Sequence, residues 1–327
     1  MKALVVTAPN DALRLAEVPR PVPGPGEVLV KIHASGVNPL DTKIRAGAAP
    51  HARHQLPAIL GLDMAGIVEQ VGPGAERFRL GDAVYGMVGG VGGVQGTLAE
   101  YAAVDAALLA HKPATLTMRE AAALPLVAIT AWEGLVDRAH VGRGQTVLVH
   151  GGAGGVGHVA VQIARAFGAS VYATERGWRA DFLQSIGATP IDFEAVSVAD
   201  YVADHTGGLG FDLVYDTAGG ATLDASFAAV RRFGQVVSCL GWGKHALAPL
   251  SFKAATYSGV FTLLPLLTGE GRDHHGAILS QVARLVDAGQ LTPRLDLRRF
   301  AFSTVADAYD AIANRAAEGK LVVDVIA

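Results

Sequence analysis

The chain has 327 residues, of which 50% are hydrophobic and 17% are charged, and its formal net charge is −3. A chain of this length is expected to hold two domains of about 150 residues each, with a large apolar core. The slightly negative charge and the scattered Lys and Arg residues exclude the basic footprint that is typical of proteins that bind nucleic acid or an anionic membrane.

A single cysteine, Cys239, excludes an internal disulfide bond and any zinc site built from several cysteines, as in proteins of a reducing compartment. The first ten residues, MKALVVTAPN, lack the long apolar segment of a secretory signal peptide. The longest apolar run, 121–131, is too short to span a membrane and contains Pro125. We therefore expect a soluble cytoplasmic protein with no membrane partner.

The N-terminal third of the chain predicts a mostly β domain. Short strands are divided by Gly and Pro, as in 19–27 (PRPVPGPGE), and this punctuation favours a partly closed antiparallel barrel. The strands are expected at 2–6, 27–32, 65–71, 83–86 and 99–104. The loop 38–47 is expected to open a short helix. A longer helix at 118–139, with Thr115 or Thr117 as its N-cap, is expected to cross into the next domain.

Strands and helices alternate from residue 144 onward, which indicates a parallel sheet with crossover helices. The strands are expected at 146–150, 170–174, 190–192, 212–216, 234–238 and 257–261, with helices at 155–167, 179–186, 196–206, 219–230 and part of 245–255. Two sets of three strands favour the doubly wound arrangement that binds dinucleotides.

The end of the chain predicts two more helices, at 275–288 and 303–318, and a final strand at 321–326. The simplest partner for that strand is the N-terminal barrel, which makes the first domain discontinuous. The expected domains are therefore a β-barrel domain of residues 1–121 and 265–327, and an α/β domain of residues 122–264 around a six-stranded parallel sheet.

The glycine-rich turn after the strand 146–150 is the strongest functional signal in the chain. Gly152, Gly154 and Gly157 form a G-x-G-x-x-G pattern, and apolar residues recur at helical spacing beyond it. Glycine allows a tight turn and a close approach of the backbone to a pyrophosphate, which the free N–H groups and the dipole of the helix then bind. The predicted phosphate-binding residues are Gly152, Ala153, Gly154, Gly155, Val156 and Gly157.

The choice between NADPH and NADH is expected to depend on the residues at the end of the second strand of this domain. Glu175 lies where an acidic side chain would bind the ribose hydroxyls and repel a 2′-phosphate. Arg176 and Arg179 could instead clamp that phosphate, or Arg179 could simply pair with Glu175 at i+4. Together with Thr174 these residues form the predicted adenosine site, for which we favour NADPH while NADH stays possible.

Seven motifs follow one another along the chain: 23–41 (PGPGEVLVKIHASGVNPLD), 56–72 (LPAILGLDMAGIVEQVG), 78–86 (FRLGDAVYG), 98–105 (LAEYAAVD), 121–135 (AAALPLVAITAWEGL), 150–164 (HGGAGGVGHVAVQIA) and 211–220 (FDLVYDTAGG). In this order they resemble the zinc-independent members of the medium-chain dehydrogenase/reductase superfamily, close to the quinone oxidoreductases and zeta-crystallin-like reductases. The resemblance covers essentially the whole chain. It implies a GroES-like catalytic domain, a Rossmann-like coenzyme domain, NAD(P)H bound in a cleft between them, and a homodimer.

Two positions argue against a catalytic zinc ion. Where zinc-dependent alcohol dehydrogenases of the superfamily have a ligating Cys, this chain has Asn38, and where they have Gly-His-Glu it has Gly61-Leu62-Asp63. Leu62 offers no lone pair to a metal ion. The chain has 125–127 (PLV) around the position of the third ligand, and it lacks the four-cysteine lobe that holds a structural zinc. We therefore expect no metal site.

The resemblance implies four residues near the reacting groups, each with a structural alternative. Asn38 could donate an amide N–H to a substrate carbonyl oxygen, or it could cap the following helix. Asp41 is expected mainly to fix local structure. Lys43 could stabilise an enolate and deliver a proton, or it could be a solvated surface residue. Thr130 could contact the nicotinamide, or it could only pack its helix.

The segment that follows the fifth strand of the α/β domain contacts the nicotinamide in relatives, which implicates Leu240 and Gly241. Cys239, directly before them, has no visible activating neighbour and is interpreted as a small hydrophobic residue. His150, at the end of a buried strand, is interpreted as structural rather than catalytic.

Without a Lewis acid, an unactivated alcohol–ketone pair is a poor substrate, whereas a quinone or an α,β-unsaturated carbonyl compound accepts hydride readily. We therefore predict a metal-independent, NAD(P)H-dependent reductase of small-molecule quinones or enones. Two alternatives are left. One is a non-catalytic NADPH-binding protein with a structural or redox-sensing role, and the other is an alcohol dehydrogenase, which the missing zinc ligands disfavour.

Overall fold

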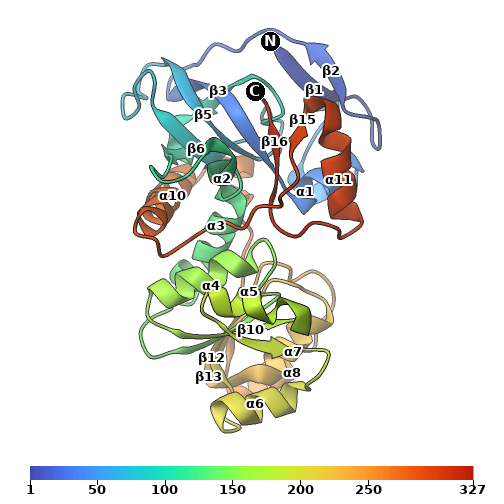
Figure 1. Cartoon of the computed structure of the whole chain (residues 1–327), viewed down its shortest axis with the longest axis vertical. Helices are drawn as coiled ribbons and strands as arrows, with labels where there is room; N and C mark the ends of the chain where they lie inside the picture. Colours follow the sequence, from blue (N-terminus) through green and yellow to red (C-terminus); the bar gives the residue numbers. More distant parts are fainter. Residues whose placement is uncertain (327) are drawn as a thin grey trace. The chain divides into compact units, whose positions relative to one another are not determined.

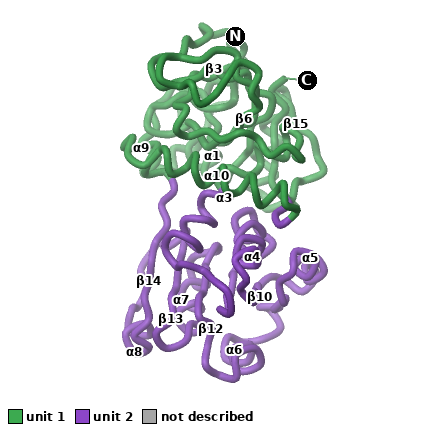
Figure 2. Tube along the Cα trace, turned by 90° about the vertical axis from the view of Figure 1, so that its left-hand side faces the viewer, with its two compact units in different colours: residues 1–126, 263–289, 293–327 green, residues 127–262, 290–292 purple. Residues whose placement is uncertain are grey.

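The computed structural model describes residues 1–326, which form two compact units (Figure 2). Unit 1 comprises residues 1–126, 263–289 and the chain from 293 onward, and unit 2 comprises residues 127–262 and 290–292. The chain first passes from unit 1 to unit 2 inside helix α3 (Pro125–Trp132). The domain boundaries expected from the sequence stay a prediction, because compact packing does not show that a segment folds independently.

Unit 1 is built on two sheets whose strands are mostly antiparallel. The smaller sheet has the order β2-β1-β4, formed by Arg14–Glu17, Lys2–Val6 and Ala58–Ile59. The larger sheet has the order β15-β16-β3-β5-β6-β8, with β7 paired to β3. Its strands are β3 (Glu27–Val37), β5 (Asp63–Val71), β6 (Ala83–Met87), β7 (Tyr101–Asp105), β8 (Leu109–His111), β15 (Phe300–Ala301) and β16 (Leu321–Asp324). The expected antiparallel β domain is confirmed.

The last strand of the chain returns to the N-terminal domain, as the sequence predicts. β16 pairs antiparallel with β3, and the register sets Leu321 opposite Val37 and Asp324 opposite Ala34. Figure 1 shows this pairing as a red strand beside a blue one. The pairing brings the residue before β16, Lys320, next to the end of β3.

The helices of unit 1 are mostly short. They are α1 (Pro39–Arg45), α2 (Met118–Ala122), α9 (Leu264–Thr268), α10 (Arg272–Asp287) and α11 (Val305–Ala313), with 3₁₀ turns at Pro50–Ala52, Ala106–Leu108 and Phe302–Thr304. Thr117 is the N-cap of α2: its hydroxyl accepts the Glu120 N–H, and the Glu120 carboxylate accepts the Thr117 N–H. In residues 1–326 no helix has the length and apolar character needed to cross a membrane.

The prediction of a single helix at 118–139 is wrong. The structure divides this segment into α2, which ends at Ala122, α3, which begins at Pro125, and a π-helical turn over Glu133–Arg138. Proline has no N–H to donate to the preceding turn, and its ring collides with the carbonyl four residues earlier, so Pro125 ends one helix and starts the next.

Unit 2 is a six-stranded parallel sheet with crossover helices, as predicted. The strand order is β11-β10-β9-β12-β13-β14. The strands are β9 (Thr146–His150), β10 (Ser170–Glu175), β11 (Thr189–Asp192), β12 (Phe211–Asp216), β13 (Val230–Ser238) and β14 (Thr256–Gly259), and the helices are α4 (Gly157–Ala166), α5 (Ala180–Ser185), α6 (Val198–Thr206), α7 (Ala221–Ala229) and α8 (Ala248–Lys253), with a 3₁₀ turn at Gly177–Arg179. β14 is the terminal strand of this sheet; the homodimer stays a prediction.

The strand order of unit 2 reverses between β9 and β12, and in doubly wound sheets ligands bind at such a point, outside the carboxyl ends of the strands. The register brings residues at the carboxyl ends of four strands into one row, because His150 lies between Thr174 and Asp216, and Asp216 lies opposite Ser238. We therefore expect a nucleotide site at this edge of the sheet.

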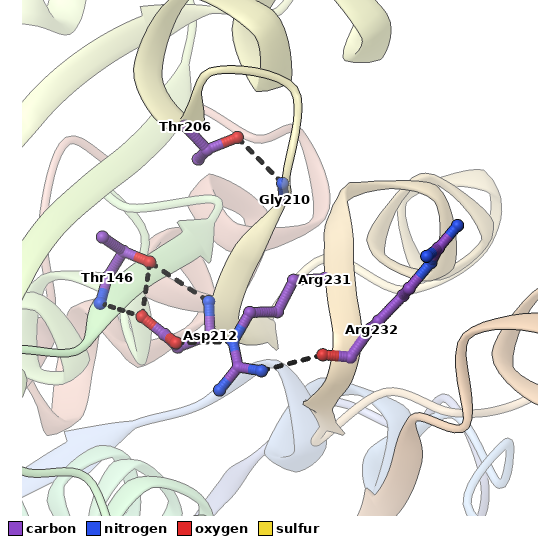
Figure 3. Close-up of polar contacts among 6 residues, drawn as sticks. All are labelled: Thr146, Thr206, Gly210, Asp212, Arg231 and Arg232. Atoms are coloured by element: carbon purple, nitrogen blue, oxygen red, sulfur yellow. Dashed lines mark hydrogen bonds and ion pairs between the residues drawn. The ribbon is translucent and has the colours of Figure 1, made fainter.

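The opposite edge of the same sheet is closed by its own side chains (Figure 3). The Asp212 carboxylate accepts hydrogen bonds from the N–H and the hydroxyl of Thr146, each at 2.7 Å, and from Nε of Arg231 at 2.6 Å. Burial opposes ionisation of Asp212, but these donors outweigh it and lower the pKa of the carboxyl group. The guanidinium of Arg232 points away from the cluster.

Candidate functional site

The loop between β9 and α4 is packed so tightly that it depends on glycine at two positions. A Cβ atom on Gly157 would lie 2.1 Å from the carbonyl oxygen of Gly151, and a Cβ atom on Gly152 would lie 2.5 Å from Cβ of Ala173 in β10. The loop is also fixed to the sheet, because the N–H groups of Gly151 and Gly152 both donate to the carbonyl oxygen of Thr174. The sequence explains this geometry, since any side chain at 152 or 157 would push the loop away from the sheet or the helix.

Three N–H groups at the start of α4 have no acceptor. Among residues 1–326, the amides of Gly155, Val156 and Gly157 make no hydrogen bond, whereas the Gly154 amide donates to the Gly151 carbonyl at 2.9 Å. α4 has ten residues, so its dipole adds positive potential to these free donors. The loop therefore fits the phosphates of a dinucleotide, which supply the anionic oxygens that it lacks.

The four residues at the carboxyl ends of the strands form a row of buried polar side chains. The hydroxyl of Thr174 lies 2.8 Å from Nδ1 of His150, and the hydroxyl of Ser238 donates to the Asp216 carboxylate at 2.7 Å. The other oxygen of Asp216 accepts the N–H groups of Ala218 and Gly219. The row fixes the shape of this edge, and most of its polar groups are satisfied within it.

His150 has one ring nitrogen without a partner. The side chain is 3% exposed, and its Nε2 atom is buried and makes no hydrogen bond among the described residues. Burial lowers the pKa of His150 to about 4, and the nearby Asp216 only partly opposes this. The imidazole is therefore neutral at physiological pH, which agrees with a structural rather than an acid–base role.

We expect His150 to make the stability of the protein depend on pH in acid. The unfolded chain binds a proton at His150 below about pH 6.5, whereas the folded chain does so only near pH 4, so stability falls as the pH decreases through this window. Between pH 7 and pH 5, His150→Gln should lose about 2 kcal/mol less stability than the unsubstituted protein. Urea unfolding of both proteins at the two pH values measures this difference, because all other groups are common to both. His111→Gln, at an exposed histidine, is the control, and identical pH profiles for His150→Gln and the unsubstituted protein would contradict the expectation.

The predicted adenosine residues divide into two ion pairs beside β10. Nη1 of Arg179 lies 3.8 Å from Oε2 of Glu175, and these side chains are 19% and 15% exposed. Nε of Arg176 lies 3.2 Å from Glu194, and both of those side chains are more than half exposed. The i+4 pairing considered from the sequence is therefore present, and Arg179 offsets the charge of Glu175. Nε of Arg179 is buried without a partner in the described part of the chain.

The segment after β13 is held in place by the polar row. The N–H of Leu240 donates to the hydroxyl of Ser238 at 3.0 Å, and a Cβ atom on Gly241 would lie 2.1 Å from the hydroxyl oxygen of Tyr257. Burial raises the pKa of the Cys239 thiol to about 12, and Asp216 raises it further in the same direction. A thiol with such a pKa is a poor nucleophile, which agrees with the interpretation of Cys239 as a small hydrophobic residue.

Thr130 lies in α3, within unit 2, and its hydroxyl is 3.0 Å from the hydroxyl of Thr262. Its carbonyl oxygen accepts the hydroxyl of Tyr215 at 2.7 Å. Thr130 is 6% exposed. These contacts account for its packing, and its contact with a nicotinamide stays a prediction.

Unit 1 holds a separate buried polar cluster of Asn38, Asp41, Asp63 and Lys320, all at most 6% exposed. The Lys320 ammonium donates to Oδ1 of Asn38 and, at 3.2 Å, to the carbonyl oxygen of Val37. Nδ2 of Asn38 donates to Asp63 at 2.9 Å, and the other oxygen of Asp63 accepts the N–H of Leu126. The Asn38 N–H donates to Asp41 at 2.7 Å, in a capping box that begins α1. Asp41 therefore fixes local structure, by accepting the Asn38 N–H at the start of α1, and the Asn38 amide is bonded to Lys320 and Asp63.

The cluster shifts the titration of its acids and its base. Burial raises the pKa of Asp41 to about 7 and that of Asp63 to about 6, against the opposing effect of Lys320. Burial also lowers the pKa of Lys320, which the two carboxylates oppose. The remaining candidate of this segment, Lys43, lies outside the cluster on the exposed side of α1.

The residues at the positions of zinc ligands do not fit a zinc ion. Leu62 is fully buried and has no donor atom, and both Asn38 and Asp63 already use their oxygens for hydrogen bonds within the protein. The Lys320 ammonium, bonded to Asn38, would also repel a second cation. Within residues 1–326 no three His, Cys, Asp or Glu side chains are grouped so as to hold a metal ion.

The sequence interpretation missed Lys320 and the structural role of Asp63. A signal existed for Asp63, because a carboxylate inside the apolar run LPAILGLDMAG needs a buried partner. No local signal marks Lys320, which precedes an ordinary apolar strand.

Two family profiles match the chain. The Alcohol dehydrogenase GroES-like domain matches residues 24–114, within unit 1, and Zinc-binding dehydrogenase matches residues 186–323. The second name does not agree with the residues at the zinc-ligand positions of this chain.

Curated proteins and solved structures resemble the chain over most of its length. A 2-methylene-furan-3-one reductase of Solanum lycopersicum is 35% identical over 305 residues, which cover 91% of this chain and 71% of that protein. An NADPH-dependent alkenal/one oxidoreductase, chloroplastic, of Arabidopsis thaliana is 34% identical over 305 residues, which cover 91% and 72%. The crystal structure of an alcohol dehydrogenase superfamily protein from Novosphingobium aromaticivorans has a TM-score of 0.98 and 60% identity, and covers 100% of both chains.

Proposed function

The chain belongs to the medium-chain dehydrogenase/reductase family of oxidoreductases, and on that premise we propose that it uses NADPH to reduce the carbon–carbon double bond of conjugated enones, with quinones as a second class of acceptor. The observation that carries the proposal is the loop before α4, with its three free N–H groups and its two sterically required glycines. This loop is suited to the pyrophosphate of the coenzyme.

NADPH would supply the hydride. The protein holds the pyrophosphate with the amides of Gly155, Val156 and Gly157, and the adenosine end with the residues that follow β10. Arg179 offsets the charge of Glu175, so a 2′-phosphate meets a guanidinium there rather than an unopposed carboxylate. This arrangement supports the preference for NADPH.

The donor set of unit 1 favours an acceptor that is already electrophilic. Hydride adds to the β-carbon of an enone, negative charge develops on its carbonyl oxygen, and the α-carbon then takes a proton. The Asn38 amide offers a neutral N–H for that oxygen, which suffices for an enolate but polarises a simple ketone much less than a metal ion does. Asp41 serves this site by fixing α1. Lys43 is the candidate proton donor, and Thr130 a candidate contact to the nicotinamide.

The relatives support enones ahead of quinones. The names of both curated relatives, a furan-3-one with a methylene group and an alkenal/one, describe carbonyl compounds with a carbon–carbon double bond. The proposal of quinones as acceptors rests on the sequence motifs that resemble those of the quinone oxidoreductases. Both classes carry a hydride-accepting carbon conjugated to a carbonyl group, so one site can reduce both.

Steady-state kinetics with matched acceptors test the proposal. We expect NADPH oxidation with small enones and enals, the saturated ketone or aldehyde as the product, and no turnover with the corresponding saturated carbonyl compound. Turnover of quinones but not of enones would move the activity to the second class. Oxidation of simple alcohols with NADP⁺ would instead support an alcohol dehydrogenase. NADPH binding in calorimetry without turnover of any acceptor would support a non-catalytic NADPH-binding protein.

A further inference from the structure

Lys320 is a buried cation that the proposed chemistry does not yet use. The side chain is 6% exposed, although a lysine ammonium is strongly hydrated when it is free. Its backbone is fixed on both sides, because its N–H donates to the carbonyl oxygen of Arg294 and its own carbonyl accepts the N–H of Asp296. A buried ammonium held this way needs acceptors with a defined geometry.

The acceptors of Lys320 determine the orientation of one amide. Oδ1 of Asn38 faces the ammonium and Nδ2 faces the Asp63 carboxylate. The flipped amide would set its NH₂ against the ammonium and its oxygen against the carboxylate, two repulsive contacts in place of two charge-assisted hydrogen bonds. The Asn38 amide therefore has a single permitted orientation.

That orientation leaves one donor unused. Nδ2 carries two N–H bonds, and among residues 1–326 it donates only to Asp63. Asn38 is 1% exposed, so the second N–H is a buried donor without an acceptor in the described protein. A buried N–H without an acceptor lowers the stability of the fold, unless a ligand oxygen accepts its hydrogen bond.

The cluster includes Asn38, at the position where zinc-dependent alcohol dehydrogenases of the superfamily have a ligating Cys, and Asp63, which follows Leu62. The Lys320 ammonium occupies the oxygen of Asn38, and N–H groups of Asn38 and Leu126 occupy the two oxygens of Asp63. A metal ion could therefore bind Asn38 only by displacing Lys320. Asp41 accepts the Asn38 N–H. Its charge, together with burial, raises the pKa of Tyr309, an effect that Arg45 opposes. The positive charge next to Asn38 is therefore the ammonium of Lys320 and not a metal ion.

We propose that Lys320 is a positioning residue whose buried ammonium locks the Asn38 amide, so that the free Nδ2–H is held ready for the oxygen of the substrate. The inference rests on the proposed function, because it assigns the developing enolate oxygen to that N–H. Lys320 itself acts through Asn38 and does not touch the substrate.

Nitrogen-15 spectra of the lysine ammonium groups test the lock without any turnover. Exposed ammonium protons exchange too fast to observe, whereas a buried, hydrogen-bonded ammonium gives a signal. Among any such signals, we expect one that Lys320→Met removes and that Asp63→Asn shifts, whereas Lys253→Met leaves it in place. Absence of an ammonium signal assignable to Lys320 in the unsubstituted protein would overturn the inference.

Kinetics of single and double variants test the positioning role. Lys320→Met is expected to lower kcat on an enone about 100-fold, the loss that is typical of a misplaced or missing transition-state donor, with the dissociation constant of NADPH unchanged. Asn38→Ala should lower kcat similarly, and the double variant should be no slower than the slower single variant, because both substitutions remove the same N–H.

Lys253→Met is the matched control. Lys253 donates to the carbonyl oxygens of Phe227, Ala228 and Val230, a purely structural set of contacts in unit 2, so its loss is expected to lower the unfolding midpoint while kcat is kept. If Lys320→Met does not fold, Asp63→Asn replaces it, with the same expected loss of kcat. Unchanged kcat in the folded variant, or additive losses in the double variant, would overturn the positioning role. Absence of turnover in the unsubstituted protein would overturn the proposed function instead. The spectra would still show whether the Lys320 ammonium is buried and hydrogen-bonded to the Asn38 amide.

Discussion

Gly157→Val is expected to weaken NADPH binding by at least about 100-fold. A Cβ atom at this position would lie 2.1 Å from the Gly151 oxygen and 2.9 Å from Cα of Gly152, so the loop backbone must move. The movement displaces the amides of Gly155 and Val156, and two lost charge-assisted hydrogen bonds at about 1.5–3 kcal/mol each amount to this factor at about 1.4 kcal/mol per tenfold change. Calorimetric or fluorescence titration with NADPH measures the effect.

Two other glycines provide a graded control for this result. A Cβ atom on Gly154 would lie 3.1 Å from the Gly151 oxygen, a contact that a small shift relieves, so Gly154→Ala should weaken binding less. A Cβ atom on Gly142, in the turn before β9, would meet nothing closer than 3.9 Å, so Gly142→Ala should leave binding unchanged. An unaltered NADPH affinity in a folded Gly157→Val protein would refute the placement of the phosphates at this loop.

The glycine loop could be predicted from sequence because everything that defines it is local. The strand, the turn and the amphipathic helix follow one another within residues 146–166, and the strand and the helix each have their own periodicity. The parallel sheet followed from the same kind of reasoning, since alternating strands and helices leave few topologies. The return of the last strand to the N-terminal barrel was predicted as the simplest solution, and the structure adds that its partner there is β3.

The segment at 118–139 shows where local reasoning fails. Its apolar residues continue without interruption across Pro125, so periodicity alone favours one helix, and the sequence interpretation gave that pattern more weight than the proline. The structure shows the opposite order of importance, with a new helix starting at Pro125. A missing N–H and a ring clash cost more than continuity of an apolar face gains.

The cluster around Lys320 could not be predicted because its members are distant in sequence. Lys320 and Asn38 are 282 positions apart, and they meet only because β16 pairs with β3 in one register. A shift of that pairing by one residue would turn every side chain of the strand to the other face. Sequence identified Asn38 and Leu62 as substituted metal ligands, but neither the pairing of Asn38 with Asp63 nor the cation that binds the Asn38 oxygen.

Arg179→Ala is expected to raise the dissociation constant of NADPH about 10- to 100-fold while changing that of NADH little. Loss of a guanidinium bonded to a phosphate costs about 1.5–3 kcal/mol, and tenfold corresponds to about 1.4 kcal/mol. The substitution also leaves Glu175 without its partner 3.8 Å away, so a 2′-phosphate would then meet an unopposed carboxylate. Arg176→Ala should have a smaller effect, because that side chain is 55% exposed and pairs with Glu194 in solvent. Titrations with both coenzymes measure the two constants for each variant.

Arg232→Ala and Glu175→Gln make this test specific. Arg232→Ala removes the same charge from unit 2 at the opposite edge of the sheet, where the guanidinium points away from its neighbours, and should change neither constant (Figure 3). Glu175→Gln should act in the reverse direction. It should weaken the binding of NADH, because a hydrogen-bond acceptor for the ribose hydroxyls is lost, and keep or strengthen the binding of NADPH. If Arg179→Ala weakened both coenzymes equally, the guanidinium would serve only to orient Glu175, and the selectivity of the site would shift to NADH. A selective loss of NADPH would mean that the ion pair is what lets a site with an acidic strand end accept a phosphorylated ribose.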